Sequence, residues 1–214
     1  MAFQIRITPG AVRAAAQEYH RLSEVTEETT VRLSALSAEL ADGWEGGSSR
    51  QVLDAFQELR TISKHISHAL EGSTFKLQHT ADAFEALDGN ASPMMAARSW
   101  DAVSLMRRPL PLRDLMLGVS DMLRIVPDQV RSVAAKMEDI SGLFRQSCEE
   151  IRRRTVELSN DWEGNAFNRF ALEMDEISDA FLQLSDGSEE LARVINEVAA
   201  RYEALDDSLR DLFR

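Results

Sequence analysis

The tripeptide Trp44-Glu45-Gly46 recurs 118 residues further along the chain as Trp162-Glu163-Gly164, and the sequence around the first copy matches the second at this one offset, without a gap. The other matches are Pro9 with Pro127, Val12-Arg13 with Val130-Arg131, Leu40 with Leu158, and Glu85-Ala86-Leu87-Asp88 with Glu203-Ala204-Leu205-Asp206. A repeat at a fixed offset indicates a tandem duplication, so we expect two similar halves.

The composition favours a folded, helix-rich protein. Hydrophobic residues make up 44% of the 214 residues, with only ten Gly and five Pro. The net charge is −12, which argues against nucleic acid as a partner, because phosphate binding depends on Lys and Arg. An anionic membrane surface is disfavoured for the same electrostatic reason.

The start of the chain contains no apolar signal-peptide core and no small-residue cleavage site. No apolar run approaches the roughly 20 residues that a membrane-spanning helix needs. We therefore expect neither export by the general secretory route nor membrane insertion. Cys148 is the one cysteine, and we interpret it as a small buried side chain rather than a reactive thiol.

Apolar residues before each tripeptide recur at alternating steps of three and four, the heptad spacing of a helix that buries one face. The stripe positions in repeat one are Val12, Ala15, Tyr19, Leu22, Thr26, Thr29, Leu33, Leu36 and Leu40. The matching positions in repeat two are Val130, Val133, Met137, Ile140, Phe144, Ser147, Ile151, Arg154 and Leu158, which keep the stripe except at Ser147 and Arg154. We expect Arg154 to reach water or pair with an acid. Pro9 and Pro127 fall where the first helical turn would begin, where a missing N–H costs nothing.

A second heptad stripe follows each tripeptide. It contains Val52, Phe56, Leu59, Ser63, Ile66, Leu70, Ser73, Leu77, Thr80, Phe84 and Leu87 in repeat one, and Phe170, Met174, Ile177, Phe181, Leu184, Ser188, Leu191, Ile195, Val198, Tyr202, Leu205, Leu209 and Leu212 in repeat two. Two helices joined by so short a turn must be antiparallel. The sequence therefore predicts an all-α protein in which two helical hairpins, residues 1–88 and 127–214, pack as an elongated four-helix bundle about 45 Å long.

The segment between the hairpins, residues 89–126, differs in composition and contains five of the eight Met. Leu112, Leu115, Met116, Val119, Met122 and Leu123 form an amphipathic stripe. We therefore expect a partly helical connection, with residues 113–125 helical and packed on the bundle.

A helix, a Trp-x-Gly turn and a second helix in about 80 to 100 residues resemble the WXG family of early-secreted-antigen-like substrates of type VII secretion systems in Gram-positive and mycobacterial bacteria. Both halves carry the turn residues, Trp44 with Gly46 and Trp162 with Gly164. Because family members act as dimers, the resemblance implies a covalently fused dimer that is a monomer in solution. The segment 89–126 departs from the family pattern.

A second family feature is the Tyr-x-x-x-Asp/Glu export signal near the end of the second helix, which Tyr202 and Asp206 match. The aligned residues of repeat one, Phe84 and Asp88, keep the aromatic ring without the hydroxyl, so we interpret them as a degenerate signal. The family dimer implies that Trp44 lies near Tyr202 and Asp206, and that Trp162 lies near Phe84.

Each of these residues also has a purely structural interpretation. The two Trp rings can plug the ends of the bundle, with part of each ring left for a partner. Gly46 and Gly164 permit turn dihedrals that a Cβ would oppose. Tyr202 occupies a stripe position and can belong to the core, whereas Asp206, on the same helix face, has no packing reason to be acidic, which favours the signal.

Residues arranged for catalysis are not evident. His65 and His68 are spaced to share a metal with Glu71 or His79, but a solvated helix face explains them better. Gly46-Gly47-Ser48-Ser49 lacks the Lys and the preceding strand of a phosphate loop, and is typical of a helix start with a Ser cap. We therefore expect no catalytic residues, no metal, no cofactor and no enzyme activity.

The leading functional hypothesis is a secreted type VII substrate that acts by protein–protein interaction, cytoplasmic before export by a non-Sec route. Its partners would be the secretion ATPase and another WXG-type protein or effector. One alternative is a cytosolic escort that targets a larger effector to the pathway. A weaker alternative is a membrane-active secreted protein that inserts its Met-rich segment.

Overall fold

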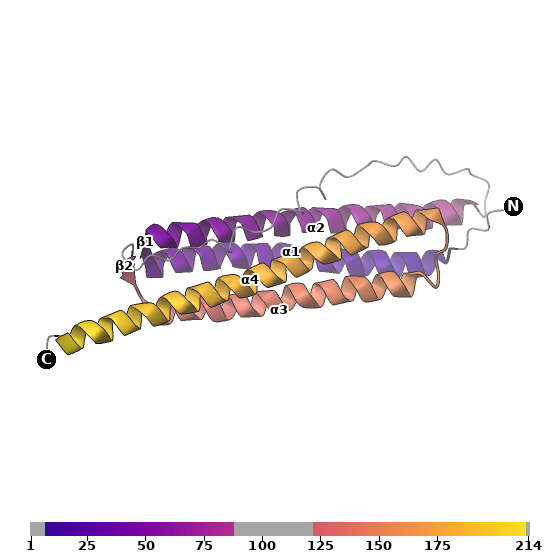
Figure 1. The fold of residues 1–214 in the computed structure, drawn as a ribbon. Helices are drawn as coiled ribbons and strands as arrows, with labels where there is room; N and C mark the ends of the chain where they lie inside the picture. Colours follow the sequence, from indigo (N-terminus) through magenta and orange to yellow (C-terminus); the bar gives the residue numbers. More distant parts are fainter. Residues whose placement is uncertain (1–6, 88–121, 213–214) are drawn as a thin grey trace. The chain divides into compact units, whose positions relative to one another are not determined.

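A computed structural model describes residues 7–87 and 122–212 and is all-α apart from two short strands (Figure 1). The order along the chain is α1 (Pro9–Gly43), β1 (Trp44–Gly46), α2 (Gly47–Leu87), β2 (Met122–Ile125), α3 (Pro127–Leu158) and α4 (Asn165–Leu212). The two hairpins and the four-helix bundle are confirmed. Helices α1 and α3 begin at the two repeat-related prolines, as predicted.

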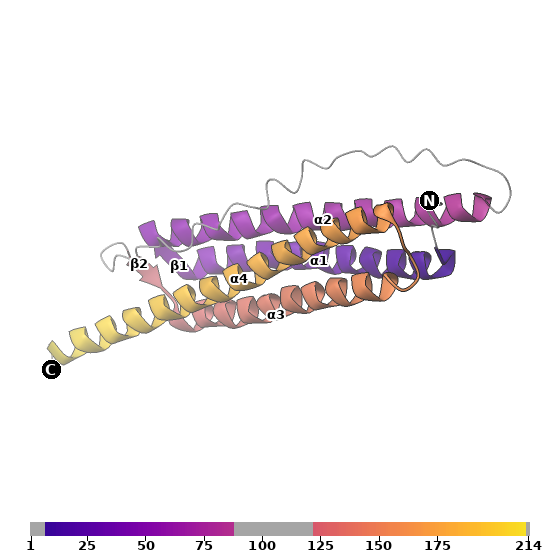
Figure 2. The same ribbon diagram turned by 45° about the vertical axis from the view of Figure 1, so that its right-hand side comes forward.

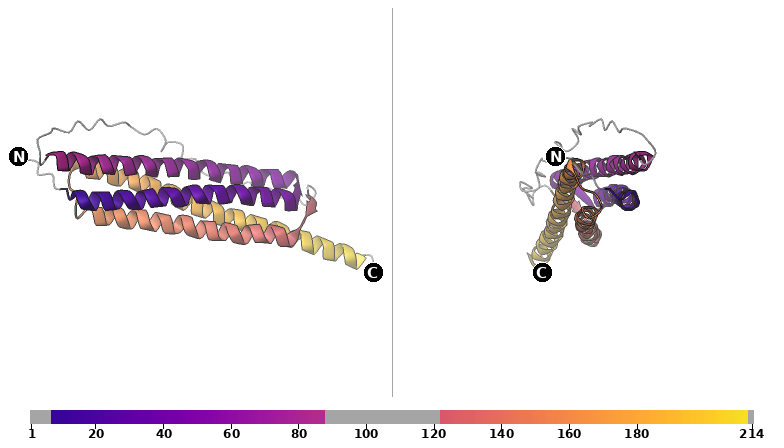
Figure 3. Two further views of the ribbon diagram at one scale, coloured as in Figure 1. Left: turned by 180° about the vertical axis from the view of Figure 1, so that it is seen from behind. Right: turned by 90° about the vertical axis from the view of Figure 1, so that its right-hand side faces the viewer.

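The chain forms two compact units, and each unit takes part of all four helices. The first comprises Met1–Glu27, Lys64–Arg108 and Arg145–Leu182, and the second comprises Glu28–Ser63, Pro109–Phe144 and Gln183–Arg214. Within each unit, helical segments from both repeats lie side by side (Figures 2 and 3). Each unit therefore contains one Trp-Glu-Gly turn and a core built from both hairpins.

The heptad stripes form these cores, as the spacing predicts. The largest fully buried side chains are Trp44, Tyr19, Phe56, Phe144, Phe181, Leu33, Leu40, Leu59, Ile66, Leu70, Leu77 and Met137. Cys148 is also buried, and burial raises the pKa of its thiol. Arg154 pairs with Glu150 and Glu157, at 3.0 Å each, so the expected acid partner is confirmed.

The stripe fails at the end of α4, where Leu205 is 42% exposed and Leu209 is 46% exposed. Both continue the heptad register of the buried Val198, so spacing alone placed them in the core. The side chain of Leu212 lies outside the described residues. The last turns of α4 thus carry an apolar stripe that the second unit does not cover.

Two pairs of contacts recur at the offset of the repeat. The Arg13 guanidinium pairs with Glu85, and the Arg131 guanidinium pairs with Glu203. The hydroxyls of Ser23 and Ser67 lie 3.4 Å apart, and those of Ser141 and Ser185 lie 3.0 Å apart. Each of these contacts joins the two helices of one hairpin. The helices of both hairpins are therefore held together by equivalent contacts.

The prediction of a helix over residues 113–125 is wrong for residues 122–125, which form strand β2. Residues 88–121 lie outside the described residues. The residue before a proline is held away from the helical region, and Val126 precedes Pro127. Its N–H donates to the Gly43 carbonyl at 2.8 Å, which continues the extended pairing of β2. Among the described residues, no helix has the length and apolar character needed to cross a membrane.

Leu59→Asp tests the heptad register. The Leu59 side chain is fully buried, so the carboxylate must be desolvated or protonated, and we expect a loss of about 3 kcal/mol or more of unfolding free energy. The matched control is Val31→Asp, at a position 65% exposed, which should change stability by less than about 0.5 kcal/mol. Equal melting temperatures for both variants would contradict the register.

Acid titration tests the repeated ion pairs. The hydrogen bonds from Arg13 and Arg131 lower the pKa values of Glu85 and Glu203. A carboxyl with a lowered folded-state pKa stabilises the protein above its unfolded pKa of about 4.3 and loses that contribution as the pH falls through the folded value. Glu85→Gln/Glu203→Gln should therefore flatten the fall in stability between about pH 5 and pH 3. The effect should be small and salt-sensitive because the pairs are exposed. A pH dependence identical to that of the unchanged chain would contradict a contribution from the two pairs.

Candidate functional site: the Trp-Glu-Gly turns and the end of α4

The first turn is a short strand between two helices. Gly46 has a φ of 147°, which a residue with a Cβ rarely adopts. Helix α2 begins at Gly47, and the Ser49 hydroxyl donates to the Gly46 carbonyl at 2.7 Å. The predicted Ser cap is therefore wrong in its form: the serine lies inside the first helical turn and donates to a carbonyl, rather than accepting from a backbone N–H.

Strand β2 pairs antiparallel with β1, so extended backbone from the other repeat lines the first turn. The paired residues are Trp44 with Ile125, Glu45 with Arg124, and Gly46 with Met122. Arg124 also lies 3.5 Å from the Glu45 carboxylate. Residues ahead of the second hairpin thus bind the turn of the first.

The second turn has the corresponding contact. Trp162 forms a bridge with Ile7, and the Thr8 N–H donates to the Asp161 carbonyl at 2.9 Å. Gly164 has a φ of 122°, so a glycine is again required by the backbone. Residues ahead of the first hairpin thus bind the turn of the second.

Both tryptophan rings are core residues. Trp44 is 1% exposed and Trp162 is 3% exposed, so the expectation that part of each ring remains available to a partner is wrong. The indole N–H of each lacks a hydrogen-bond partner among the described residues. The outward-facing residues of the turns are the glutamates, since Glu45 and Glu163 are exposed.

The packing around the two rings differs. The Trp162 ring lies 5.7 Å from the ring of Phe167 and 5.6 Å from that of Phe170, and Phe170 lies 5.8 Å from Tyr19, measured between centroids. The residues at the same places in the other repeat are Ser49, Val52 and Met137. An aromatic cluster therefore plugs the second turn, and aliphatic and polar side chains take its place at the first.

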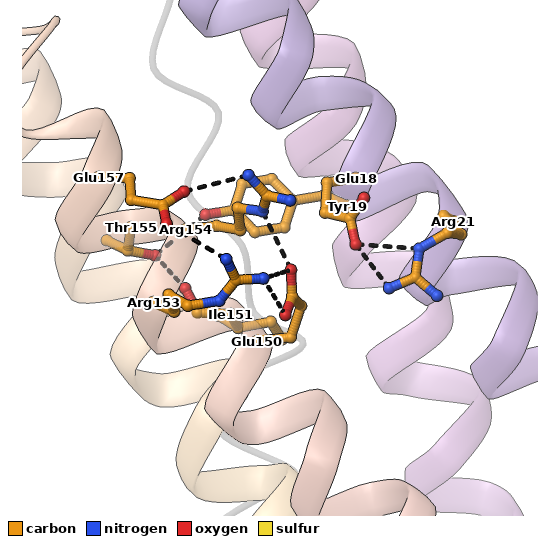
Figure 4. Close-up of polar contacts among 9 residues, drawn as sticks. All are labelled: Glu18, Tyr19, Arg21, Glu150, Ile151, Arg153, Arg154, Thr155 and Glu157. Carbon is orange, nitrogen blue, oxygen red and sulfur yellow. Dashed lines mark hydrogen bonds and ion pairs between the residues drawn. The ribbon is translucent and has the colours of Figure 1, made fainter.

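A buried hydroxyl pair joins α1 to α3 beside this cluster (Figure 4). The hydroxyls of Tyr19 and Thr155 lie 3.0 Å apart, and the Thr155 hydroxyl donates to the Ile151 carbonyl at 2.8 Å. Tyr19 is therefore the donor in the pair. Burial raises the pKa of Tyr19 to about 12, so it stays protonated at neutral pH.

Tyr202 and Asp206 lie one turn apart on α4 and are both half-buried. The Asp206 carboxylate accepts from Arg210 at 2.6 Å, a partner that the sequence analysis did not anticipate. In Figure 1 the last turns of α4 continue past the β1–β2 pair of the same unit, and Trp44 belongs to that unit as well.

The corresponding residues of repeat one are only partly described. Phe84 is half-buried and belongs to the same unit as Trp162. Asp88 lies outside the described residues. The predicted difference between Asp206 in repeat two and Asp88 in repeat one therefore stays a prediction.

The histidines of α2 do not gather around a common point with acids. His68 lies 3.4 Å from Glu71, an exposed pair one turn apart. Across residues 7–87 and 122–212 no group of three or more His, Cys, Asp or Glu side chains is placed to hold a metal ion.

Sequence reasoning missed the residues that bind the turns, although a signal was present. The tetrapeptide Arg6-Ile7-Thr8-Pro9 matches Arg124-Ile125-Val126-Pro127 at the offset of the repeat. A proline favours an extended backbone in the residue before it, so β-branched residues ahead of a proline are candidates for a strand. The recurrence of this pattern before both first helices could have identified Ile7 and Ile125.

The family model for proteins of 100 residues with WXG matches the chain twice, over residues 4–89 and 122–207. The chain belongs to this family, as a tandem member. Protein YukE of Bacillus subtilis (strain 168) is 32% identical over 88 residues, 41% of this chain and 91% of YukE. The type VII secretion system extracellular protein A of Staphylococcus aureus (strain USA300) is 26% identical over 90 residues, 42% of this chain and 86% of that protein. No solved structure gives a significant match.

Substitutions at the Tyr19–Thr155 pair should differ in a defined order. Tyr19→Phe removes the donor and leaves the Thr155 hydroxyl bound to Ile151, so we expect a loss of about 1 kcal/mol. Thr155→Val leaves the buried Tyr19 hydroxyl without this acceptor, and should cost more, about 1–3 kcal/mol. Denaturant unfolding of both variants and of the double variant measures the coupling. Additive losses would contradict a direct bond.

Proposed function

We propose that the chain is a substrate of a type VII secretion pathway that leaves the cell as an intramolecular pseudo-dimer and acts by binding other proteins. Membership of the WXG family supports this, as does similarity to a protein named as an extracellular component of such a system. Both family matches lie in one chain, so a single polypeptide supplies the two hairpins that a dimer would otherwise bring together.

The observation that carries the proposal is the Tyr202–Asp206 pair on the exposed end of α4. The secretion ATPase would contact this end, where Leu205 and Leu209 add uncovered apolar surface beside the Asp206 carboxylate. Because the Trp44 ring is buried, its part in a composite signal would be to fix the turn, and the ATPase would meet the exposed Glu45 rather than the indole. Such a signal requires binding alone and no chemistry.

Export assays in the native cell test the signal. Tyr202→Phe reproduces the ring of the degenerate repeat-one site and should lower the amount of protein in the medium at least about tenfold, if the hydroxyl contributes a hydrogen bond worth about 1.4 kcal/mol to recognition. Asp206→Ala should do the same. Quantitative blots of medium and cytosol provide the measurement.

The controls separate the signal from local helix stability. Arg210→Ala removes the partner of Asp206 and leaves the carboxylate, so export should stay near normal. Asp88→Ala, at the equivalent place in repeat one, should also be exported. Equal losses for Asp206→Ala and Arg210→Ala would show that the ion pair, and not the signal, matters; normal export of Tyr202→Phe and Asp206→Ala would remove the signal from this account.

Fractionation also decides between the substrate and an escort. An escort docks a larger effector and stays in the cytosol while the effector leaves, so wild-type protein would be absent from the medium of intact cells. A substrate accumulates there. Affinity capture from both fractions, with mass spectrometry, identifies the bound proteins.

A further inference from the structure

Both turns contact a segment from the other repeat at equivalent positions, the first through a short strand and the second through a single bridge. The first turn binds Ile125 and Val126, which precede α3, and the second binds Ile7 and Thr8, which precede α1. We call residues 7–8 and 125–126 the two leaders. Each leader belongs to one hairpin and contacts the turn of the other, so the two contacts form a reciprocal pair.

The hydrogen bonds of the two leaders are repeat equivalents. The Thr8 N–H donates to the Asp161 carbonyl at 2.9 Å, and the Val126 N–H donates to the Gly43 carbonyl at 2.8 Å. Both donors and both acceptors are related by the offset of 118 that relates the tripeptides. Two unrelated loops would rarely form the same hydrogen bond at equivalent positions of two repeats. The contact is therefore a feature of the repeated hairpin.

Each leader donates to a carbonyl at or just beyond the end of the first helix of the other hairpin. Gly43 is the last residue of α1, and the last carbonyls of a helix have no partner within it. Asp161 lies three residues beyond Leu158, the last residue of α3, so its carbonyl belongs to the turn that follows the helix. The prolines that follow the leaders hold Thr8 and Val126 away from the helical region, so the leader is prepared for strand pairing before it docks.

From this geometry we infer that each Trp-Glu-Gly turn is a strand-addition site whose ligand is an extended Ile-x-Pro leader, supplied by the other hairpin. In strand addition, main-chain hydrogen bonds provide the affinity between the extended segment and the site. Here each leader contacts the turn of the other hairpin and not the turn of its own. The leaders thus add a main-chain contact between the hairpins to the burial of their apolar stripes. The inference concerns the pairing of hairpins and does not rest on export.

Backbone hydrogen exchange in the full-length chain tests the two bonds. Thr8 and Val126 lie just ahead of α1 and α3, where neither amide has an acceptor within its own helix, so protection at these amides reports on the leaders. We expect both to exchange at least about tenfold more slowly than unstructured amides. Exchange of both at the unstructured rate would overturn the proposal, and protection of only one would overturn its reciprocity.

Proline substitutions test whether the hydrogen bonds of the leaders stabilise the paired hairpins. Thr8→Pro and Val126→Pro remove one N–H each while keeping an extended backbone, whereas Thr8→Ala and Val126→Ala keep the donor. Each Pro variant should melt about 2–4 °C below its Ala control, the shift of one lost net hydrogen bond in a chain of this size. Melting temperatures equal to those of the Ala controls, for both positions, would show that the leaders do not contribute to hairpin pairing.

Discussion

The burial of four heptad stripes against one another is the constraint on which the rest of this structure depends. Each hairpin of this chain carries an apolar stripe along both of its helices, and a fully buried Leu or Ile side chain contributes about 1.5–3 kcal/mol. Each compact unit contains segments of all four helices and therefore side chains of both repeats. Neither hairpin can form such a core alone, so the duplication places inside one chain the partner that a separate hairpin must find by association. Joining two binding modules raises the effective concentration of each for the other.

The two repeats share the contacts that join the helices of a hairpin and differ around their turns. Contacts between the first and second helix of a hairpin occur in both repeats, as with Arg13–Glu85 and Arg131–Glu203. Residues around the turns differ. Tyr19 corresponds to Met137, and the hydroxyl pair and ring contacts of Tyr19 lie beside the Trp162 turn.

The opposite asymmetry occurs at the helix ends, where Tyr202 corresponds to Phe84. The repeat with the hydroxyl at the end of its second helix thus lacks the buried hydroxyl in its first. Within each repeat the aromatic hydroxyl occurs at one place or the other, at Tyr19 in repeat one and at Tyr202 in repeat two.

The sequence predicted the helices, their register and the hairpins because all three follow from local periodicity and from two prolines. It did not predict β2, because the apolar residues from Leu112 to Leu123 fit a helical stripe, and the strand that pairs with β2 lies far away in the chain, at Trp44–Gly46. The spacing also placed Leu205 and Leu209 in the core. A heptad specifies which face of a helix is apolar, but the neighbouring helices determine how far along its length that face is covered.

The tryptophans illustrate the same limit. Their place in a turn suggested partial exposure, whereas both rings are buried. Trp44 pairs with the distant Ile125, and Trp162 pairs with the distant Ile7. Motif and spacing located the candidate site, and tertiary contacts determined which of its groups face outward.

If one chain supplies both hairpins of the bundle, the protein is a monomer in solution, and its mass tests this most directly. Sedimentation equilibrium from low to high micromolar concentration should give a single species of 24.0 kDa, because the stripes of each hairpin are already covered by the other. A species of twice that mass at low micromolar concentration, in reversible equilibrium with a partly unfolded monomer, would contradict the account, since it would mean that the hairpins pair between chains rather than within one.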